Sequence, residues 1–297
     1  MLSEDVQVYR TRDGRPGEIR PRQDPVVYGG AEDGPLTAAE LDGYQRNGFH
    51  TFDQLLTAEE VRECREEVAR LVQRPERYTD ERYIVEPAAD EVRSIFQVHA
   101  VSPLFDRIIK DSRLVLVARQ LLGSEVYIHQ TRINAKPAFT GSGFYWHSDF
   151  ETWHAEDGMP RVRALSFSIG LTENYPHNGP LMIIPGSHQW FVSSAAPTPP
   201  ENHKSSLGKQ EVGVPEEEIL HRIAEDNGGV HQVVGAPGSA VAFDCNCMHG
   251  SAENITPYPR ANLFVVFNSV HNTLVEPFAA PARRPEYLAD RTFTPLG

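Results

Sequence analysis

The chain has 297 residues, of which 40% are hydrophobic and 23% charged, and its formal net charge is −13. This composition is typical of a globular protein large enough to bury a core. The acidic balance argues against nucleic acid as the main partner, because binding a phosphate backbone needs a basic surface. The N-terminus has no apolar signal core, and no stretch approaches the roughly 18 apolar residues of a membrane span. We therefore expect no membrane partner.

The cysteine count bears on the compartment. Cys64, Cys245 and Cys247 are the three cysteines of the chain. An odd and sparse set provides no disulfide framework, so a reducing compartment is favoured. Together with the missing signal core, this predicts a cytoplasmic protein.

The N-terminal part of the chain divides into an irregular and a helical region. Residues 1–35 are rich in Arg, Asp, Pro and Gly without periodicity, and we expect an N-terminal extension that packs on the domain or stays mobile. Residues 36–297 are expected to form a single domain. Thr37 and Thr57 are each followed three residues later by Glu, which is the capping-box pattern of a helix start. Apolar residues recur at helical spacing after Thr57.

From about residue 126 the pattern changes to period two. In RALSFSIGL, Leu165, Phe167 and Ile169 point one way and small residues point the other, which suits a barrel wall beside a cavity. Residues 127–136, 180–188, 238–244 and 261–270 predict further strands. Helices do not alternate with these strands, so we expect a mainly β fold with flanking helices, an antiparallel sandwich or jelly roll.

One polar segment interrupts the strands. Residues 193–214 are rich in Pro and Ser and too long for a tight connection, so they form an inserted loop. Such a loop is often a lid over a site, although an idle surface excursion fits equally well. A short helix is predicted to begin at Pro215 and to end at Gly228–Gly229.

The stretch WHSDFETWH at residues 146–154 holds more titratable groups than a core strand needs. On an extended segment, His147 and Asp149 point to the same side. His249, which follows a predicted strand, is the best candidate for a third ligand. Two histidines and one carboxylate on one face of an octahedron are the arrangement of non-haem Fe(II) oxygenases. On the same extended pattern, Trp153 forms either a pocket wall or a core aromatic.

Each of these motifs is common by chance when taken alone. The presence of Arg260 together with them strengthens the prediction of a metal site. Arg260 begins a strongly apolar strand eleven residues after His249, and its planar fork would anchor a dicarboxylic co-substrate. A zinc site is the rival, because Cys245, Cys247 and His249 alternate and would share one face of a straight strand. A purely structural zinc protein has no need of Arg260.

The motifs around His147, His249 and Arg260, with NGPLMIIPGSH at 178–188 between them, resemble the phytanoyl-CoA hydroxylase superfamily of Fe(II)- and 2-oxoglutarate-dependent dioxygenases. Residues 36–61 are similar to the N-terminal helices of that superfamily. Within it, FYWHSDFETWHAEDGMPRVRALSFSI at 144–169 closely resembles the signature of the ectoine hydroxylases.

The resemblance implies a double-stranded β-helix (jelly-roll, cupin-like) core, a homodimer and a cytoplasmic location. It also implies that ectoine, 2-oxoglutarate and O2 become 5-hydroxyectoine, succinate and CO2 with Fe(II) as the cofactor. By position, it assigns iron to His147, Asp149 and His249, 2-oxoglutarate to Arg260, Ser251, Phe144 and Asn134, and ectoine to Gln130, Trp153, Phe243, Phe264 and Arg284.

Overall fold

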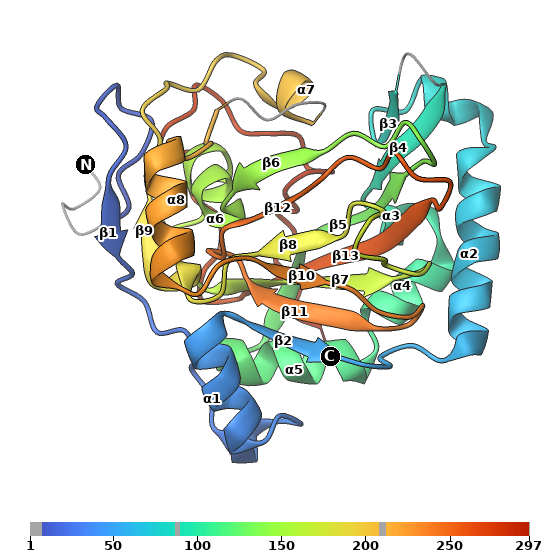
Figure 1. The fold of residues 1–297 in the computed structure, drawn as a ribbon, viewed down its shortest axis with the longest axis horizontal. Helices are drawn as coiled ribbons and strands as arrows, with labels where there is room; N and C mark the ends of the chain where they lie inside the picture. The colour runs from blue at the N-terminus through green and yellow to red at the C-terminus, as the bar shows by residue number, and fades with distance from the viewer. Residues whose placement is uncertain (1–7, 87–89, 208–211, 297) are drawn as a thin grey trace.

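The computed structural model describes residues 8–86, 90–207 and 212–296. Most of its strands belong to two antiparallel sheets, drawn one over the other in Figure 1. The larger sheet has the strand order β2-β11-β7-β13-β5-β4-β3, and the smaller has the order β10-β8-β12-β6. The strands of the larger sheet are β2 (Phe49–Phe52), β3 (Tyr83–Glu86), β4 (Glu91–Phe96), β5 (Val126–Lys136), β7 (Ala164–Gly170), β11 (Ala240–Asp244) and β13 (Arg260–Ser269). Those of the smaller sheet are β6 (Phe144–His147), β8 (Leu181–Ile183), β10 (His231–Val233) and β12 (His249–Ser251).

Helices flank these sheets, and the prediction of a mainly β fold with flanking helices is confirmed. The helices are α1 (Ala38–Asn47), α2 (Ala58–Val72), α3 (Val98–Val101), α4 (Pro103–Ile109), α5 (Ser112–Leu122), α6 (Asp149–Thr152), α7 (His203–Ser206) and α8 (Glu217–Asp226). Both predicted capping boxes are formed, with Thr37 and Thr57 as the N-caps of α1 and α2. None of the helices within the described residues is long and apolar enough to cross a membrane.

The alternation of side chains on β7 decides which face of the larger sheet meets the helices. Leu165, Phe167 and Ile169 belong to the largest hydrophobic cluster, together with residues of α2, α4 and α5. A second buried cluster joins Ile183 of β8 to Phe243 and Phe264 of the larger sheet, so the two sheets pack against each other. Ser166 and Ser168 lie on the face of β7 opposite the helices, as predicted.

The segment after His147 departs from the extended conformation expected for residues 146–154. The chain leaves β6, enters α6 at Asp149 and continues as a π-helical turn from Trp153 to Asp157. The buried side chains of Glu151 and Glu156 explain the change, because both form ion pairs with Arg12 that a straight strand would not allow. A π-helical turn inside a helical segment is frequent at functional sites.

The described part of the N-terminal segment lies against the domain. Its strand β1 (Ile19–Pro21) pairs with β9 (Trp190–Val192), and Tyr9 is buried against Phe150 and Phe191. The segment 193–214 follows β9 and contains α7, which Figure 1 places away from the helices that cover the larger sheet. The domain boundary at residue 35 stays a prediction.

Candidate metal centre and adjoining cavity

Three side chains from distant parts of the chain meet beside the smaller sheet. His147 is the last residue of β6, Asp149 is the first of α6, and His249 is the first of β12. His147 and His249 are direct partners in the β6–β12 ladder, which brings residues about 100 positions apart side by side. The structure therefore brings together the three residues that the sequence singled out.

Their ligand atoms lie close enough to share one ion. Asp149 Oδ1 is 3.6 Å from His147 Nε2 and 3.9 Å from His249 Nε2, and the two imidazole rings are 4.3 Å apart. One ligand atom from each residue lies within 4.8 Å of the others. These separations fit three ligands on one face of a coordination sphere.

The hydrogen bonds of the two histidines orient them as ligands. Nδ1 of His147 contacts the carbonyl oxygen of Tyr145 at 2.7 Å, and Nδ1 of His249 contacts that of Cys247 at 3.0 Å. A carbonyl oxygen only accepts, so each Nδ1 carries a proton, and in the neutral ring Nε2 then keeps the lone pair that binds a metal. Metal-binding histidines are commonly fixed in this way.

The charge state of the cluster favours a cation. Burial would raise the pKa of Asp149, but His249, His147 and Arg132 outweigh it and lower that pKa below its usual value. Burial and the neighbouring His147 lower the pKa of His249 to about 4. At neutral pH the site therefore offers a carboxylate and a neutral imidazole at His249.

The alternative zinc site is not supported. Asp244 ends β11, and residues 245–248 lie outside any strand, so Cys245, Cys247 and His249 do not share the face of a straight strand. Cys247 donates a hydrogen bond from Sγ to the carbonyl of Gly48, and burial raises the pKa of both thiols well above the usual value. Among the described residues, the group that could hold a metal is His147, Asp149 and His249.

A cavity adjoins the metal ligands, and parts of several distant segments enclose it. The residues lining it are Phe96, Gln130, Arg132, Phe144, His147, Asp149, Thr152, Trp153, Glu156, Asn202, Ser206, Leu207, Val212 and Arg284. Asn202, Ser206, Leu207 and Val212 are described residues of the segment 193–214 and form part of the cavity wall. The lid and the idle surface excursion both stay predictions.

Three of the five residues expected to contact ectoine line this cavity. Trp153 is buried with its ring edge-on to His129, and Gln130 donates a hydrogen bond from Nε2 to the carbonyl of Leu288 at 2.6 Å. Arg284 is held by Asp157 through two hydrogen bonds of 2.7 and 2.6 Å. The guanidinium is thus fixed in orientation by a buried carboxylate.

The other two, Phe243 and Phe264, lie in the hydrophobic cluster between the sheets and do not line this cavity. Both still contact residues of the site. The ring of Phe243 is 5.2 Å from that of His249, and the guanidinium of Arg132 lies 4.8 Å from the ring centre of Phe264. Phe243 and Phe264 therefore pack against His249 and Arg132 from the hydrophobic cluster between the sheets.

Arg260 is buried at the start of β13. Its Nη1 donates to the carbonyl of Gly179 at 2.6 Å, while its Nε is buried without a hydrogen-bond partner among the described residues. Within the described ranges, no carboxylate lies at ion-pair distance from Arg260. Burial and Arg132 lower its pKa to about 10. A buried cation with an unsatisfied donor is costly, and an anionic ligand would offset that cost.

The remaining residues expected around 2-oxoglutarate lie on both sheets, Ser251 and Phe144 on the smaller and Asn134 on the larger. Ser251 pairs with Phe144 across the β12–β6 ladder, and Asn134 pairs with Asn262 of β13. Phe144 lines the cavity and stacks under the guanidinium of Arg93 at 4.7 Å, whereas Ser251, Asn134 and Arg260 do not line it. The expected co-substrate residues are thus not all on one cavity wall.

Sequence reasoning missed two basic residues on β5. Arg132 lines the cavity with its guanidinium between the rings of Phe144 and Phe264, and within the described part of the chain its Nε has no hydrogen-bond partner. Lys136 is the direct cross-strand neighbour of Arg260, and burial together with Arg260 and Arg93 lowers its pKa to about 6. The period-two pattern through Gln130 and Asn134 also includes these positions and could have found them.

A buried ionic network lies behind the cavity wall. Arg12 donates from Nε and Nη2 to Glu151 at 2.9 and 2.7 Å and from Nη1 to Glu156 at 2.6 Å. Thr11 donates to Glu151, and Asn202 of the inserted segment donates to Glu156. The N-terminal segment, the helical turn after Asp149 and the inserted segment are therefore held together by one set of charges.

The sequence profile of the phytanoyl-CoA dioxygenase (PhyH) family matches residues 44–262. The chain belongs to this family. It is 54% identical to the ectoine dioxygenase of Streptomyces coelicolor over 98% of this chain and 97% of that protein. It is 48% identical to the ectoine dioxygenase of Halomonas elongata over 93% of this chain and 84% of that protein. The resemblance read from the sequence is thereby confirmed.

Solved structures agree with the sequence relatives. The crystal structure of EctD from S. alaskensis with 2-oxoglutarate and 5-hydroxyectoine superimposes with a TM-score of 0.86 at 46% identity, covering 96% of this chain and 94% of that one. The carbocyclase SnoK of nogalamycin biosynthesis reaches a TM-score of 0.58 at 19% identity, covering 81% of this chain and 86% of that one. The second likeness concerns the fold alone.

Proposed function

We propose that this protein hydroxylates ectoine to 5-hydroxyectoine, using Fe(II), 2-oxoglutarate and O2 and releasing succinate and CO2. The observation that carries the proposal is the convergence of His147, Asp149 and His249 beside a cavity lined by Trp153 and Arg284. Relatives named ectoine dioxygenase that match nearly the whole chain support the choice of substrate.

The donor set fits iron. His147, Asp149 and His249 would hold Fe(II) through two imidazole nitrogens and one carboxylate oxygen, a set that leaves positions open for co-substrate and O2. With 2-oxoglutarate and O2, the bound metal supplies the oxidising power that replaces a C–H bond of the substrate by C–OH. The protein contributes ligand orientation, through the carbonyls of Tyr145 and Cys247 that fix the imidazoles.

Arg260 would bind the distal carboxylate of 2-oxoglutarate. Its buried Nε has no hydrogen-bond partner in the described ranges, and the neighbouring Lys136 adds a second donor near the same point. Ser251, Asn134 and Phe144, on strands beside Arg260 and His147, would complete the co-substrate site. A guanidinium binds a carboxylate through two parallel hydrogen bonds, which fixes both position and orientation.

Ectoine is a compact zwitterion with a delocalised cationic ring and a carboxylate. The face of Trp153 suits the cation, and the guanidinium of Arg284, held by Asp157, suits the carboxylate. Gln130 offers its amide group, while Phe243 and Phe264 contact residues of the site from the core. The inserted segment contributes Asn202, Leu207 and Val212 and excludes water from the reaction.

The test is turnover of the Fe(II)-loaded protein with 2-oxoglutarate and O2. Succinate and 5-hydroxyectoine should form in equal amounts with ectoine, and little succinate should form without it. Proline, another small cyclic zwitterion, serves as the comparison substrate. Turnover with proline and none with ectoine would contradict the choice of substrate, and no succinate release with any solute would contradict the enzyme class.

A homodimer, a cytoplasmic location and a role in osmotic stress are the further parts of this proposal. The composition and the scarcity of cysteine support a reducing compartment. Light scattering of the purified protein checks the dimer, with a mass near 33.2 kDa as the result that would contradict it.

A further inference from the structure

The pairing of β6 with β12 does not by itself fix the positions of the two segments that carry the metal ligands. His147 and His249 pair directly, but the register of the β6–β12 ladder shifts between His249 and Ser251. Asp149 lies outside the ladder altogether, in α6. Backbone pairing therefore leaves the carboxylate ligand to be positioned by other contacts.

Ser148, between the first two ligands, makes such a contact. It occupies the N-cap position of α6, where a serine hydroxyl commonly accepts a hydrogen bond from the helix backbone, but it makes no such bond here. Its Oγ lies 3.1 Å from Asn246 Oδ1 and 3.4 Å from the carbonyl oxygen of Cys245. The backbone N–H of Phe150 also donates to that carbonyl, at 2.8 Å. The segment holding His147 and Asp149 is thus bound to the turn that leads to His249.

Asn246 is itself fully bonded. Its Nδ2 donates to the carbonyls of His188 and Trp190, both at 3.0 Å, and its backbone N–H donates to Asp244 Oδ1 at 2.8 Å. The side chain is 1% exposed. A buried amide with every group satisfied has one orientation, which makes it a rigid support.

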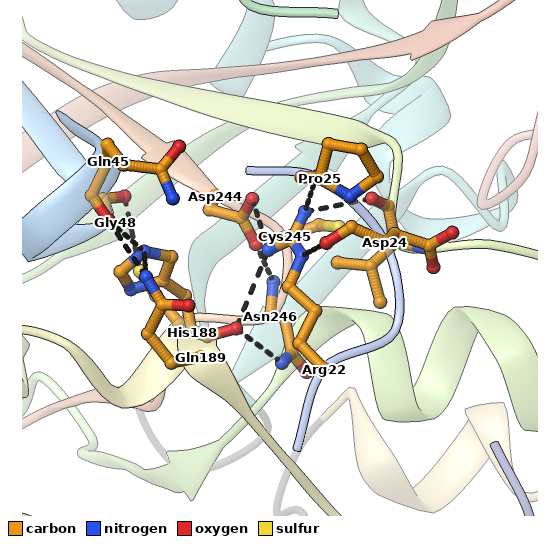
Figure 2. Close-up of polar contacts among 12 residues, drawn as sticks. Arg22, Asp24, Pro25, Gln45, Gly48, His188, Gln189, Asp244, Cys245 and Asn246 are labelled. Atoms are coloured by element: carbon orange, nitrogen blue, oxygen red, sulfur yellow. Dashed lines mark hydrogen bonds and ion pairs between the residues drawn. The ribbon is translucent and has the colours of Figure 1, made fainter. Parts of the chain in front are cut away.

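The N-terminal segment secures the base of this turn. Arg22 donates from Nη1 to Asp244 Oδ2 at 2.8 Å, and both side chains are buried. The other nitrogens of Arg22 donate to the carbonyls of Asp24, Pro25 and Val162. Figure 2 shows Arg22, Asp244 and Asn246 in one connected set of contacts with the backbone of His188.

We infer that Asn246 is a positioning residue for the metal, acting through Ser148 on the segment that holds His147 and Asp149. The inference rests on the proposed iron site but not on the identity of the substrate. Loss of the amide would leave Ser148 only its longer contact, 3.4 Å to the carbonyl oxygen of Cys245, and the two ligand segments would be held less firmly. Outer-shell partners of metal ligands typically contribute about 10–100-fold to metal affinity.

The test is Co(II) binding to the apoprotein without oxygen, followed through the visible d–d absorption. We expect Asn246→Ala to weaken Co(II) binding roughly 10-fold or more and Ser148→Ala to weaken it less. The double variant should lose little more than Asn246→Ala alone, because the two side chains act as one unit. Additive losses, or an unchanged Co(II) affinity in Asn246→Ala, would overturn the inference.

Asn268 offers a matched control. It is fully buried, and its amide also makes two donor bonds and one acceptor bond, to Tyr127 and Asn272. Asn268→Ala should lower the melting temperature much as Asn246→Ala does while leaving Co(II) affinity unchanged. Equal losses of Co(II) affinity in both variants would show general destabilisation and overturn the positioning role. This test measures Co(II) affinity and no turnover, so its result can be interpreted even if the ectoine assay fails.

Discussion

Replacing Arg12 by alanine should destabilise the protein far more than removing any surface arginine. The guanidinium is fully buried and pairs with Glu151 and Glu156, whose side chains are 1% and 3% exposed. Removing one member of a buried ion pair leaves an uncompensated charge and costs about 3–5 kcal/mol. Thr11 and Asn202 still donate to the two carboxylates, so part of the charge remains stabilised.

Thermal unfolding of the apoprotein measures this cost. At the upper end of the usual size range, about 1 kcal/mol shifts the melting temperature by about 2 °C, so Arg12→Ala should melt about 6–10 °C lower. Arg15→Ala is the control in the same segment, because Arg15 pairs with Asp13 at the surface with its side chain 53% exposed. An exposed pair contributes about 0–1 kcal/mol, which is within about 2 °C.

A neutralised variant separates unpaired charge from lost packing. Arg12→Met combined with Glu151→Gln and Glu156→Gln removes the charges together and should recover much of the loss. If Arg12→Ala melts within 2 °C of the Arg15→Ala control, the network has no stabilising role. If the combined variant melts no higher than Arg12→Ala, the lost contacts of the side chain rather than the unpaired charges explain the effect.

Three further predictions address the site and its surroundings. Arg260→Ala should raise the 2-oxoglutarate concentration needed for half-maximal rate at least about 30-fold, the equivalent of about 2 kcal/mol for a truncated buried charge pair; saturation like that of the unaltered protein would refute the anchor. Asp149→Ala should fail to retain iron after gel filtration while keeping its far-ultraviolet circular dichroism, and unchanged iron content would remove Asp149 from the ligand set. Burial lowers the pKa of His154 from 6.5 to about 4, so the folded state favours the neutral ring and loses about 3 kcal/mol of stability as pH falls from about 6.5 to about 4. His154→Phe should reduce this acid-dependent fall in melting temperature, and an unchanged fall would refute the assignment.

The parts of the site that the sequence predicted are those governed by short-range patterns. His147 and Asp149 stand out because two ligand types lie two residues apart, and Arg260 because it begins an apolar strand. The capping boxes at Thr37 and Thr57 depend on residues three positions apart, and both formed. These features need no knowledge of the tertiary structure.

The parts that could not be predicted depend on distant partners. The helical turn after Asp149 replaces the expected extended chain, and Glu151 there pairs with Arg12, 139 residues earlier in the chain. The helices between residues 98 and 122, whose apolar faces cover the larger sheet, were not anticipated for a different reason: α4 and α5 have the local N-caps Ser102 and Asp111, which could have predicted them. Local propensity is a weak guide wherever tertiary contacts decide the conformation.

The contact between Arg22 and Asp244 joins residues 222 positions apart. Such a long-range pairing forms late in folding, because the entropic cost of closing a large loop precedes the stabilising contact between its ends. During synthesis the ribosome must release the chain beyond Asp244 before this support can assemble. The strand β12 with the ligand His249 and the central strand β13 of the larger sheet also follow Asp244, so a nascent chain that ends before them can neither complete the two sheets nor hold iron. Cofactor loading therefore belongs to a late stage of maturation.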